Sequence, residues 1–156
     1  MKEETNAGEK LITTNRKAHF NYFLSDFQEA GIALLGSEIK AMRLGHCSLD
    51  DSYVIIKNNE AFILNMNIPL FQENGIFSHD PVRTRKLLLH KAQILRLEEA
   101  STREGYTIIP IRVYLKKGYA KVQIALGKGK KNWDKRATIK ERETKIMVAK
   151  ATKRQG

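Results

Sequence analysis

The residues that could do acid–base, nucleophilic or metal chemistry are few in this sequence and stand far apart. The four histidines are scattered, and none has a second ligand at the spacing of a metal site. They are His19, His46, His79 and His90. The adjacent carboxylates Asp50 and Asp51 fit a turn or a helix cap better than a catalytic pair. Cys47 is the only cysteine, which excludes an internal disulfide and any zinc site of several cysteines. We therefore expect no catalytic residues, no metal and no cofactor.

Positive charge is the stronger chemical signal, and it is concentrated at one end of the chain. The 156 residues include 28 Lys+Arg and 17 Asp+Glu, which gives a net charge of +11. Residues 127–156 hold 11 of the basic and 3 of the acidic residues, so they carry +8 and leave +3 for residues 1–126. Such a segment repels itself and cannot bury enough apolar surface to fold alone. We expect it to meet a polyanion, with nucleic acid favoured over an anionic membrane because no clean apolar stripe occurs at helical spacing.

One aromatic residue lies inside this basic segment. An exposed tryptophan such as Trp133 adds nothing to solubility, but stacking of a base on it contributes about 1–3 kcal/mol. The run Gly127–Lys131 lacks the spacing and the closing Ser or Thr of a Walker phosphate loop. We therefore interpret the segment as a tail that binds a polyanion. The alternative is a solubilising tail without a target.

Three basic clusters also occur in the body of the chain: Arg16-Lys17, Arg83–Lys86, and Lys116-Lys117 with Lys121. Each can be explained as a solvated surface. The second cluster opens a predicted helix, where cations oppose the macrodipole, so a phosphate that also binds the free helix N–H groups would account for it. Contact with folded RNA would use these charges for backbone and shape. No carboxylate–metal cluster is visible, which argues against a nuclease.

Hydrophobic periodicity predicts the elements that position these residues in the first part of the chain. Residues 11–14 and 22–27 predict strands, and residues 32–35 predict a return strand after a tight turn at Gly31. A short helix is expected over residues 37–44, capped by its first residue, with a glycine directly after it as the stop.

The second part of the chain continues the pattern. Residues 53–57 and 60–65 predict a hairpin around Asn58-Asn59, because asparagine tolerates positive φ. A helical pattern covers residues 84–104, but its apolar positions do not lie on one face of a single helix. A break near His90, which gives a short and then a longer helix, would explain them. Two further strands are expected over residues 107–115 and 120–126. Pro110, inside the first of them, indicates an edge or a bulge.

These elements predict a mainly β fold. About six short antiparallel strands with about three peripheral helices fit an OB-fold-like antiparallel β-barrel, which presents a strand face and loops to RNA. We expect a disordered N-terminus over residues 1–10, the barrel over residues 11–126 and a flexible basic tail over residues 127–156. No apolar run approaches the ~20 residues that span a bilayer, and residues 1–10 have no apolar signal-peptide core, so we expect a cytoplasmic protein.

With these residues in view, the sequence resembles the SsrA-binding protein family (small protein B, SmpB) from about Ile12 to Glu143. The motifs that carry the resemblance are specific in combination. They are Asn15-Arg16-Lys17-Ala18, Glu29-Ala30-Gly31-Ile32, Gly36-Ser37-Glu38-Ile39-Lys40, Asp51-Ser52-Tyr53, His79-Asp80-Pro81, Arg83-Thr84-Arg85-Lys86-Leu87-Leu88-Leu89, Ala120-Lys121-Val122, Gly129-Lys130-Lys131 and Asp134-Lys135-Arg136.

The resemblance implies a non-enzymatic RNA-binding adaptor. In that family the protein binds the tRNA-like domain of transfer-messenger RNA and takes part in bacterial trans-translation, the rescue of stalled ribosomes. The tail enters the empty message channel near the small-subunit decoding centre. It also implies no membrane partner and no small-molecule substrate. The alternative that the residues leave open is a general OB-type protein that binds single strands or assists ribosome assembly.

The family pattern and the basic clusters together predict two groups of site residues. Those expected at transfer-messenger RNA, as contacts or supports, are Asn15, Arg16, Lys17, Phe20, Tyr22, Glu29, Arg83, Arg85, Lys86, Leu89 and Lys121. Those expected in the ribosome-binding tail are Lys128, Gly129, Lys130, Lys131, Trp133, Asp134, Lys135, Arg136, Ile139, Lys140 and Arg142. Glu29 is an unusual residue to face RNA, and a carboxylate there either accepts from a guanine edge, orients an arginine or stabilises a turn.

Two residues depart from the family pattern. Phe20 stands where the family usually has histidine, so a ring that stacks is kept and a histidine charge is not. Trp133 stands where histidine or tyrosine is frequent, so stacking on a decoding-centre base is kept and proton chemistry is excluded.

Overall fold

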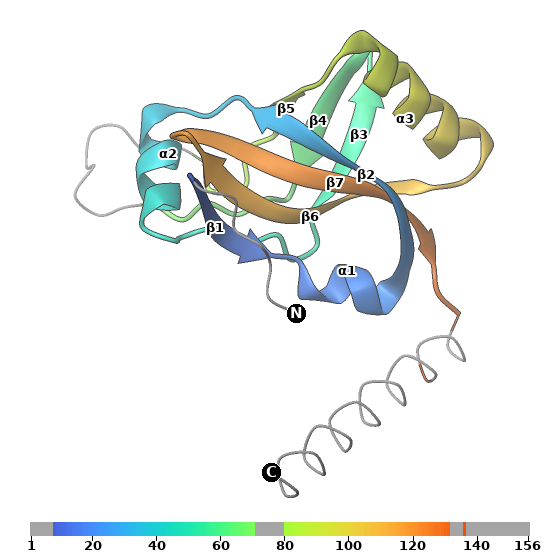
Figure 1. Cartoon of the computed structure of the whole chain (residues 1–156), viewed down its shortest axis with the longest axis horizontal. Coiled ribbons are helices and arrows are strands. Elements are labelled where there is room, and N and C mark those ends of the chain that lie inside the picture. The colour runs from blue at the N-terminus through green and yellow to red at the C-terminus, as the bar shows by residue number, and fades with distance from the viewer. Residues whose placement is uncertain (1–7, 71–79, 132–135, 137–156) are drawn as a thin grey trace, which may run out of the picture.

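The computed structural model describes residues 8–70, 80–131 and 136 of the chain (Figure 1). Seven strands form one antiparallel sheet, and three helices lie around it in the described residues. In chain order the elements are β1 (Glu9–Thr14), α1 (Arg16–Asn21), β2 (Tyr22–Ile32), α2 (Gly36–Arg43), β3 (Tyr53–Lys57), β4 (Glu60–Leu64), β5 (Arg85–Leu88), α3 (Lys91–Arg103), β6 (Thr107–Lys116) and β7 (Tyr119–Gly129). The predicted mainly β class is confirmed.

The strands close into a ring. The sheet order is β1-β6-β3-β4-β5-β2-β7, and β7 also pairs with β6, so the strands from β2 to β7 form a closed circuit. The remaining strand, β1, lies outside the circuit. β6 accommodates it because β6 pairs with β3 at Ile108 and with β1 from Arg112 to Lys116. This arrangement is the predicted OB-like one, with β1 as an addition to its edge.

The hairpin of β3 and β4 forms as the two asparagines predict. Asn58 and Asn59 have φ angles of 52° and 59°, the positive values that a two-residue hairpin turn needs. The register runs without interruption from Lys57 opposite Glu60 to Tyr53 opposite Leu64. Local chemistry alone therefore determines this unit.

The predicted turn at Gly31 is wrong, because β2 is one continuous strand from Tyr22 to Ile32. Gly31 pairs with Lys121 of β7 on one side and with Leu88 of β5 on the other. A Cβ added at Gly31 would lie 3.2 Å from Cβ of Leu88, so glycine here permits close approach of β5 rather than a reversal of the chain.

The predicted helix over residues 84–104 is also partly wrong. Its first segment is the strand β5, which fills the gap in the ring between β4 and β2. Burial alternates along it, with Arg85 and Leu87 inside and their neighbours outside. The expected break near His90 is confirmed, because α3 begins after His90, whose backbone N–H donates to Oε1 of Gln93 at 2.9 Å.

The helix α2 lies where it was expected, but its cap differs. Ser37 is inside the helix, and the N-cap is Leu35. The backbone N–H of Leu35 donates to Oε1 of Glu38 at 2.8 Å, which satisfies one of the donors left open at a helix start. Gly45, with φ of +86°, follows the helix as its predicted stop.

Two apolar cores hold these elements together. The larger core fills the ring, with residues such as Met42, Ile63, Leu87, Leu97 and Ile124 almost completely buried. The smaller core lies on the outer side of β6 and β7 beneath α1. It consists of Ala18, Ile109, Ile111 and Ala125, with Tyr22 and Leu24 packed against it. A register shift between Pro110 and Arg112 confirms the bulge predicted from the proline.

Candidate nucleic-acid interface

Side chains from four neighbouring strands form a polar surface outside the ring. Opposite residues of paired strands point to the same side, and the register aligns Glu29 of β2 with Gln123 of β7, Gln123 with Arg112 of β6, and Arg112 with Thr14 of β1. The next row aligns Lys121 of β7 with Tyr114 of β6. We call this surface the polar sheet face. Its residues are Glu9, Thr14, Glu29, Arg112, Tyr114, Lys116, Lys121 and Gln123.

Glu29 is held in a fixed position on the β2 side of the polar sheet face. The Tyr114 hydroxyl donates to Oε2 of Glu29, and Nζ of Lys116 lies 3.6 Å from the same oxygen. Burial, together with the bond to Glu29 and its negative charge, raises the pKa of Tyr114 above its usual value, so the phenol stays a neutral donor. The Glu29 side chain is still 39% exposed. The turn-stabilising alternative for Glu29 is wrong, since the residue lies within a strand.

The cations of this face are arranged beside Glu29. Nε of Arg112 donates to Oε1 of Gln123 at 3.0 Å, and its guanidinium carbon lies 5.0 Å from the Tyr114 ring centroid. Lys121 has no ion-pair partner within the part of the chain that the structure describes. The surface therefore offers cations for phosphate and one oriented carboxylate for a hydrogen-bond donor.

The helix α1 limits the polar sheet face at one end. It covers the outer side of β6 at Ile109 and Ile111, so only the later half of β6 stays open. Asn15 fixes the start of this helix, because Nδ2 donates to the Pro110 carbonyl at 2.9 Å and its backbone N–H donates to the Ile111 carbonyl at 2.7 Å. Asn15 is buried, so it acts as a support and not as a direct RNA contact.

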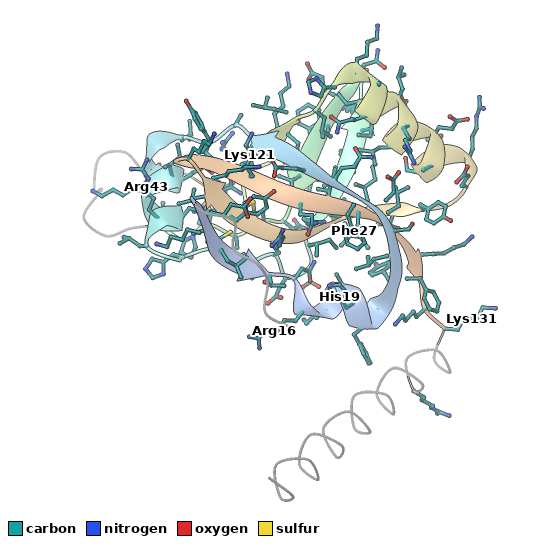
Figure 2. The ribbon with its side chains drawn as sticks, viewed as in Figure 1. Arg16, His19, Phe27, Arg43, Lys121 and Lys131 are labelled. Atoms are coloured by element: carbon teal, nitrogen blue, oxygen red, sulfur yellow. The ribbon has the colours of Figure 1, made fainter. Side chains whose placement is uncertain are left out.

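A second group of predicted residues gathers around α1. Arg16 and Lys17 are exposed on the helix, while Phe20 and Tyr22 are half-buried. Figure 2 shows Arg16 and His19 on α1 and Lys131 beyond the end of β7, whereas Lys121 lies farther back along β7. A Cβ added at Gly127 would lie 3.2 Å from Cβ of Tyr22, so β7 passes closely under this ring.

The first residues of the expected tail are attached to the body. β7 continues through Gly129, past the boundary expected at Leu126. The backbone N–H of Lys130 donates to the Asn21 carbonyl at 2.9 Å, and its Nζ donates to the His19 carbonyl at 3.1 Å and lies 5.0 Å from the Phe23 ring centroid. Nζ of Lys128 lies 5.3 Å from the centroid of the Tyr106 ring, directly before β6. The described basic residues Lys131 and Arg136 are exposed.

The remaining predicted tail residues lie outside the described residues. They are Trp133, Asp134, Lys135, Ile139, Lys140 and Arg142.

Arg85 does not belong to any RNA surface, which corrects its predicted role. Its side chain is 0% exposed, and its Nε donates to Oε2 of Glu38. Its Nη1 donates to the Met66 carbonyl at 2.6 Å. Arg83 joins the same carboxylate through Nη2, 2.6 Å from Oε1 of Glu38. The proposed phosphate site at a helix start is wrong here, because this segment is the strand β5 and its arginine points inward.

Glu38 is the anion of this buried network. Burial alone would raise its pKa, but hydrogen bonds from Arg83, from the Leu35 backbone and from Arg85, with the charge of Arg85, hold the pKa of Glu38 below its usual 4.5. The carboxylate is thus ionised in the folded protein at neutral pH. It joins α2 to β5 and to the loop before it.

The two other predicted residues near β5 have different environments. Lys86 is exposed, and its Nζ lies 3.3 Å from Oε1 of Glu60 on β4. Leu89 is half-buried and packs against the larger core, so it supports β5 from inside. Only Lys86 offers a charge to a partner here.

Five residues of the polar sheet face did not stand out in the sequence: Glu9, Thr14, Arg112, Tyr114 and Gln123. For the last three a signal was present. Their signal was the period of two along β6 and β7, in which polar residues alternate with buried Val113 and Val122. The alternation indicated a shared outer face. It could not indicate that Glu29, far earlier in the chain, lies beside them.

The sequence has relatives among known proteins. The family model described as SmpB protein matches residues 12–154. An SsrA-binding protein of Oenococcus oeni is 50% identical over 142 residues, which cover 91% of this chain and 92% of the relative. One of Acholeplasma laidlawii is 54% identical over 136 residues, with 87% and 91% covered. The chain belongs to the SsrA-binding protein family. The resemblance drawn from its motifs is confirmed.

A solved structure agrees with this membership. It is described as “tmRNA-SmpB: a journey to the center of the bacterial ribosome” and has a TM-score of 0.67 and 35% identity to this chain. The match covers 79% of this chain and 87% of the solved chain. As a member of the family, this chain thus also shares the family fold.

Two features are absent from the described residues. No group of three or more His, Cys, Asp or Glu side chains lies close enough to hold a metal ion. No helix in residues 8–70 or 80–131 is long and apolar enough to cross a membrane.

Proposed function

We propose that this protein is the RNA-binding adaptor of trans-translation: it binds the tRNA-like domain of transfer-messenger RNA and delivers it to stalled ribosomes. The observation that carries the proposal is membership of the family, with half of the residues identical to an SsrA-binding protein across 91% of the chain. A relative of known structure is described with transfer-messenger RNA and the bacterial ribosome. A ribosomal partner makes the cytoplasm the expected compartment.

The polar sheet face is the surface that suits a folded RNA. Arg112, Lys116 and Lys121 supply cations for phosphates, and no deep cleft is required because folded RNA is recognised largely through its shape. Glu29 is preset by Tyr114 and Lys116, so its exposed carboxylate is ready to accept from a base edge or a ribose hydroxyl. The exposed cations Arg16 and Lys17 on α1 extend the charged surface toward the end of β7.

The basic tail has the complementary role in this proposal. Residues 127–156 carry +8 of the total charge of +11, and the message channel of a ribosome is lined by RNA phosphate. Lys130 is bonded to Asn21 and His19, so the first residues of the tail lie beside α1. The tail then senses an empty channel, while the body holds transfer-messenger RNA. No catalytic step is assigned to any residue.

A truncation tests this division of labour. The chain should be cut after Lys131, because a cut after Leu126 would remove paired residues of β7. We expect affinity for transfer-messenger RNA close to that of the full chain and loss of tagging on stalled ribosomes. Loss of most RNA affinity in the truncated protein would contradict the proposal. A matched variant that keeps the tail and carries Lys121→Ala should lose affinity for transfer-messenger RNA, the property that the truncated protein keeps.

The alternative is a general OB-type protein that binds single strands or assists ribosome assembly. Competition between the folded tRNA-like RNA and random single strands, at two salt concentrations, separates the two. The adaptor prefers the folded RNA, with a salt slope of roughly −3.5 to −4.5 if about five phosphates are contacted. A preference for unstructured strands favours the alternative. A nuclease would produce new RNA ends when incubated with Mg²⁺, and we expect none.

A further inference from the structure

The strand β2 contains one extra residue opposite β7. Ser25 pairs with Leu126 and Gln28 pairs with Ile124, so three steps along β2 face two steps along β7. Asp26 has φ of 53°, in the left-handed region, and the register shifts across this position. This geometry is a β-bulge, a feature that commonly redirects side chains beside binding sites.

The bulge exchanges the two sides of β2. Before it, Leu24 packs into the smaller core under α1, and Ser25 lines a hollow next to α3. Regular alternation would therefore turn Glu29 toward α3 as well. Because of the extra residue, Glu29 instead reaches Tyr114 on the polar sheet face. Phe27, two positions before Glu29, is turned to the same side.

Polarity is inverted at the two residues after Asp26. Phe27 is apolar and 49% exposed. Gln28 is polar, yet its Oε1 is buried and has no hydrogen-bond donor among the described residues. A buried acceptor without a donor destabilises a fold, and an exposed phenyl ring gains little from folding. Exchanging the two side chains would improve both positions, so stability does not explain why phenylalanine is outside.

The position of Phe27 suits a stacking platform. Phe27 lies on β2 opposite the middle of β7, and Figure 2 labels it together with Lys121 on β7 and His19 on α1. The bulge that carries it is fixed from the other side, where Nε of Arg96 on α3 lies 3.0 Å from Oδ2 of Asp26. A half-exposed ring on a braced strand can present a π face to an unpaired base, and Arg112 and Lys121 lie farther along the same outer face.

We propose that Phe27 stacks on an unpaired base of the RNA that binds the polar sheet face, and that the Asp26 bulge exists to present Phe27 and Glu29 together. This inference rests on the proposed function and adds a base contact to it. The cations bind phosphates whatever the sequence, whereas Phe27 requires a base that is free to leave its helix. A stacking contact at Phe27 would therefore favour RNA with a loop or a bulged base over a continuous duplex.

The test measures affinity of full-length variants for the tRNA-like domain of transfer-messenger RNA. Phe27→Ala should weaken binding by about 5- to 100-fold, the loss of one stacked base, while the slope of affinity against salt is unchanged. Phe27→Trp should retain binding and Phe27→Leu should behave like Phe27→Ala, because leucine has no π face. Leu95→Ala is the matched control, since Leu95 on α3 is also 49% exposed.

A double exchange supplies an independent arm. Phe27→Gln with Gln28→Phe keeps the composition, and we expect a higher melting temperature together with the binding loss of Phe27→Ala. The inference is overturned if Phe27→Ala or the double exchange binds within twofold of wild type, if leucine substitutes fully, or if the salt slope changes by one unit. If the wild-type protein shows no preference for this RNA over random single strands, the proposed function fails instead.

Discussion

Glu38 and Glu29 are both bound by a hydrogen-bond donor and a cation, but they lie in opposite environments. Glu38 is completely buried and receives Arg83, Arg85 and the Leu35 N–H. Glu29 receives only the Tyr114 hydroxyl and a lysine at 3.6 Å, and more than a third of its side chain is exposed. The hydrogen-bonding capacity of the Glu38 carboxylate is filled by groups of the protein itself. The Glu29 carboxylate retains acceptor capacity for a partner.

This difference separates charges that build the fold from charges that stay available to a partner. Each glutamate lies in one of the family motifs, so neither residue type nor membership of a motif distinguishes them. What distinguishes them is whether the partners of each charge come entirely from inside the molecule. Removing one partner of a buried, fully paired charge destabilises the fold strongly. Removing an exposed charge changes stability little.

The strongest test of the comparison is Glu38→Gln. The change leaves Arg85 buried without its counter-charge, so we expect a loss of about 3–5 kcal/mol in the free energy of unfolding, measured with urea. Glu29→Gln is the matched control, with an expected change of less than about 1 kcal/mol and a measurable loss of affinity for transfer-messenger RNA. Equal destabilisation by the two variants would remove the distinction.

Acid should reveal the same contrast. The folded pKa of Glu38 is below the usual 4.5, so between these values the unfolded chain binds more protons than the folded one. The stability from Glu38 is therefore complete above about pH 4.5 and is lost as the pH falls through the folded pKa. Urea titrations from pH 6 to pH 3 should show a fall that is smaller in Glu38→Gln. An identical fall in both proteins would contradict the role of this carboxylate.

The smallest expected effect concerns the donor to Glu29. Tyr114→Phe removes one hydroxyl, so we expect a loss of about 0.5–1.5 kcal/mol in the free energy of unfolding. Affinity for transfer-messenger RNA should fall as well, because Glu29 is no longer oriented. Tyr119→Phe, at a ring that is 73% exposed, is the control for stability and should be neutral. Unchanged RNA affinity in Tyr114→Phe would show that the orientation of Glu29 is irrelevant to binding.

Sequence patterns predicted the parts of the fold whose determinants are close together in the chain. The turn at Asn58-Asn59, the end of α2 just before Gly45 and the start of α3 after His90 each depend on a few adjacent residues. The failures were β5 and the middle of β2. A run of three leucines after Lys86 suits a helix or a strand, and only the gap between β4 and β2 selects the strand.

The candidate site divides in the same way. Lys121 and Glu29 were predicted, and the structure brings them onto one face with Arg112 and Tyr114. Arg85 was predicted as an RNA contact and is buried. A basic residue in a family motif is equally suitable for a phosphate or a buried carboxylate. The choice depends on a glutamate 47 positions earlier in the chain.

The sequence by itself determined the class of the protein: a β-rich body of low net charge, a strongly basic end, and motifs that assign the family. These properties follow from composition, alternation and short-range turn chemistry, which do not require knowledge of distant contacts. Only the tertiary structure decided which charges are buried and which side of β2 carries the polar sheet face. Ring closure pairs residues that are far apart in the chain, and a single extra residue at Asp26 reverses every side chain that follows it.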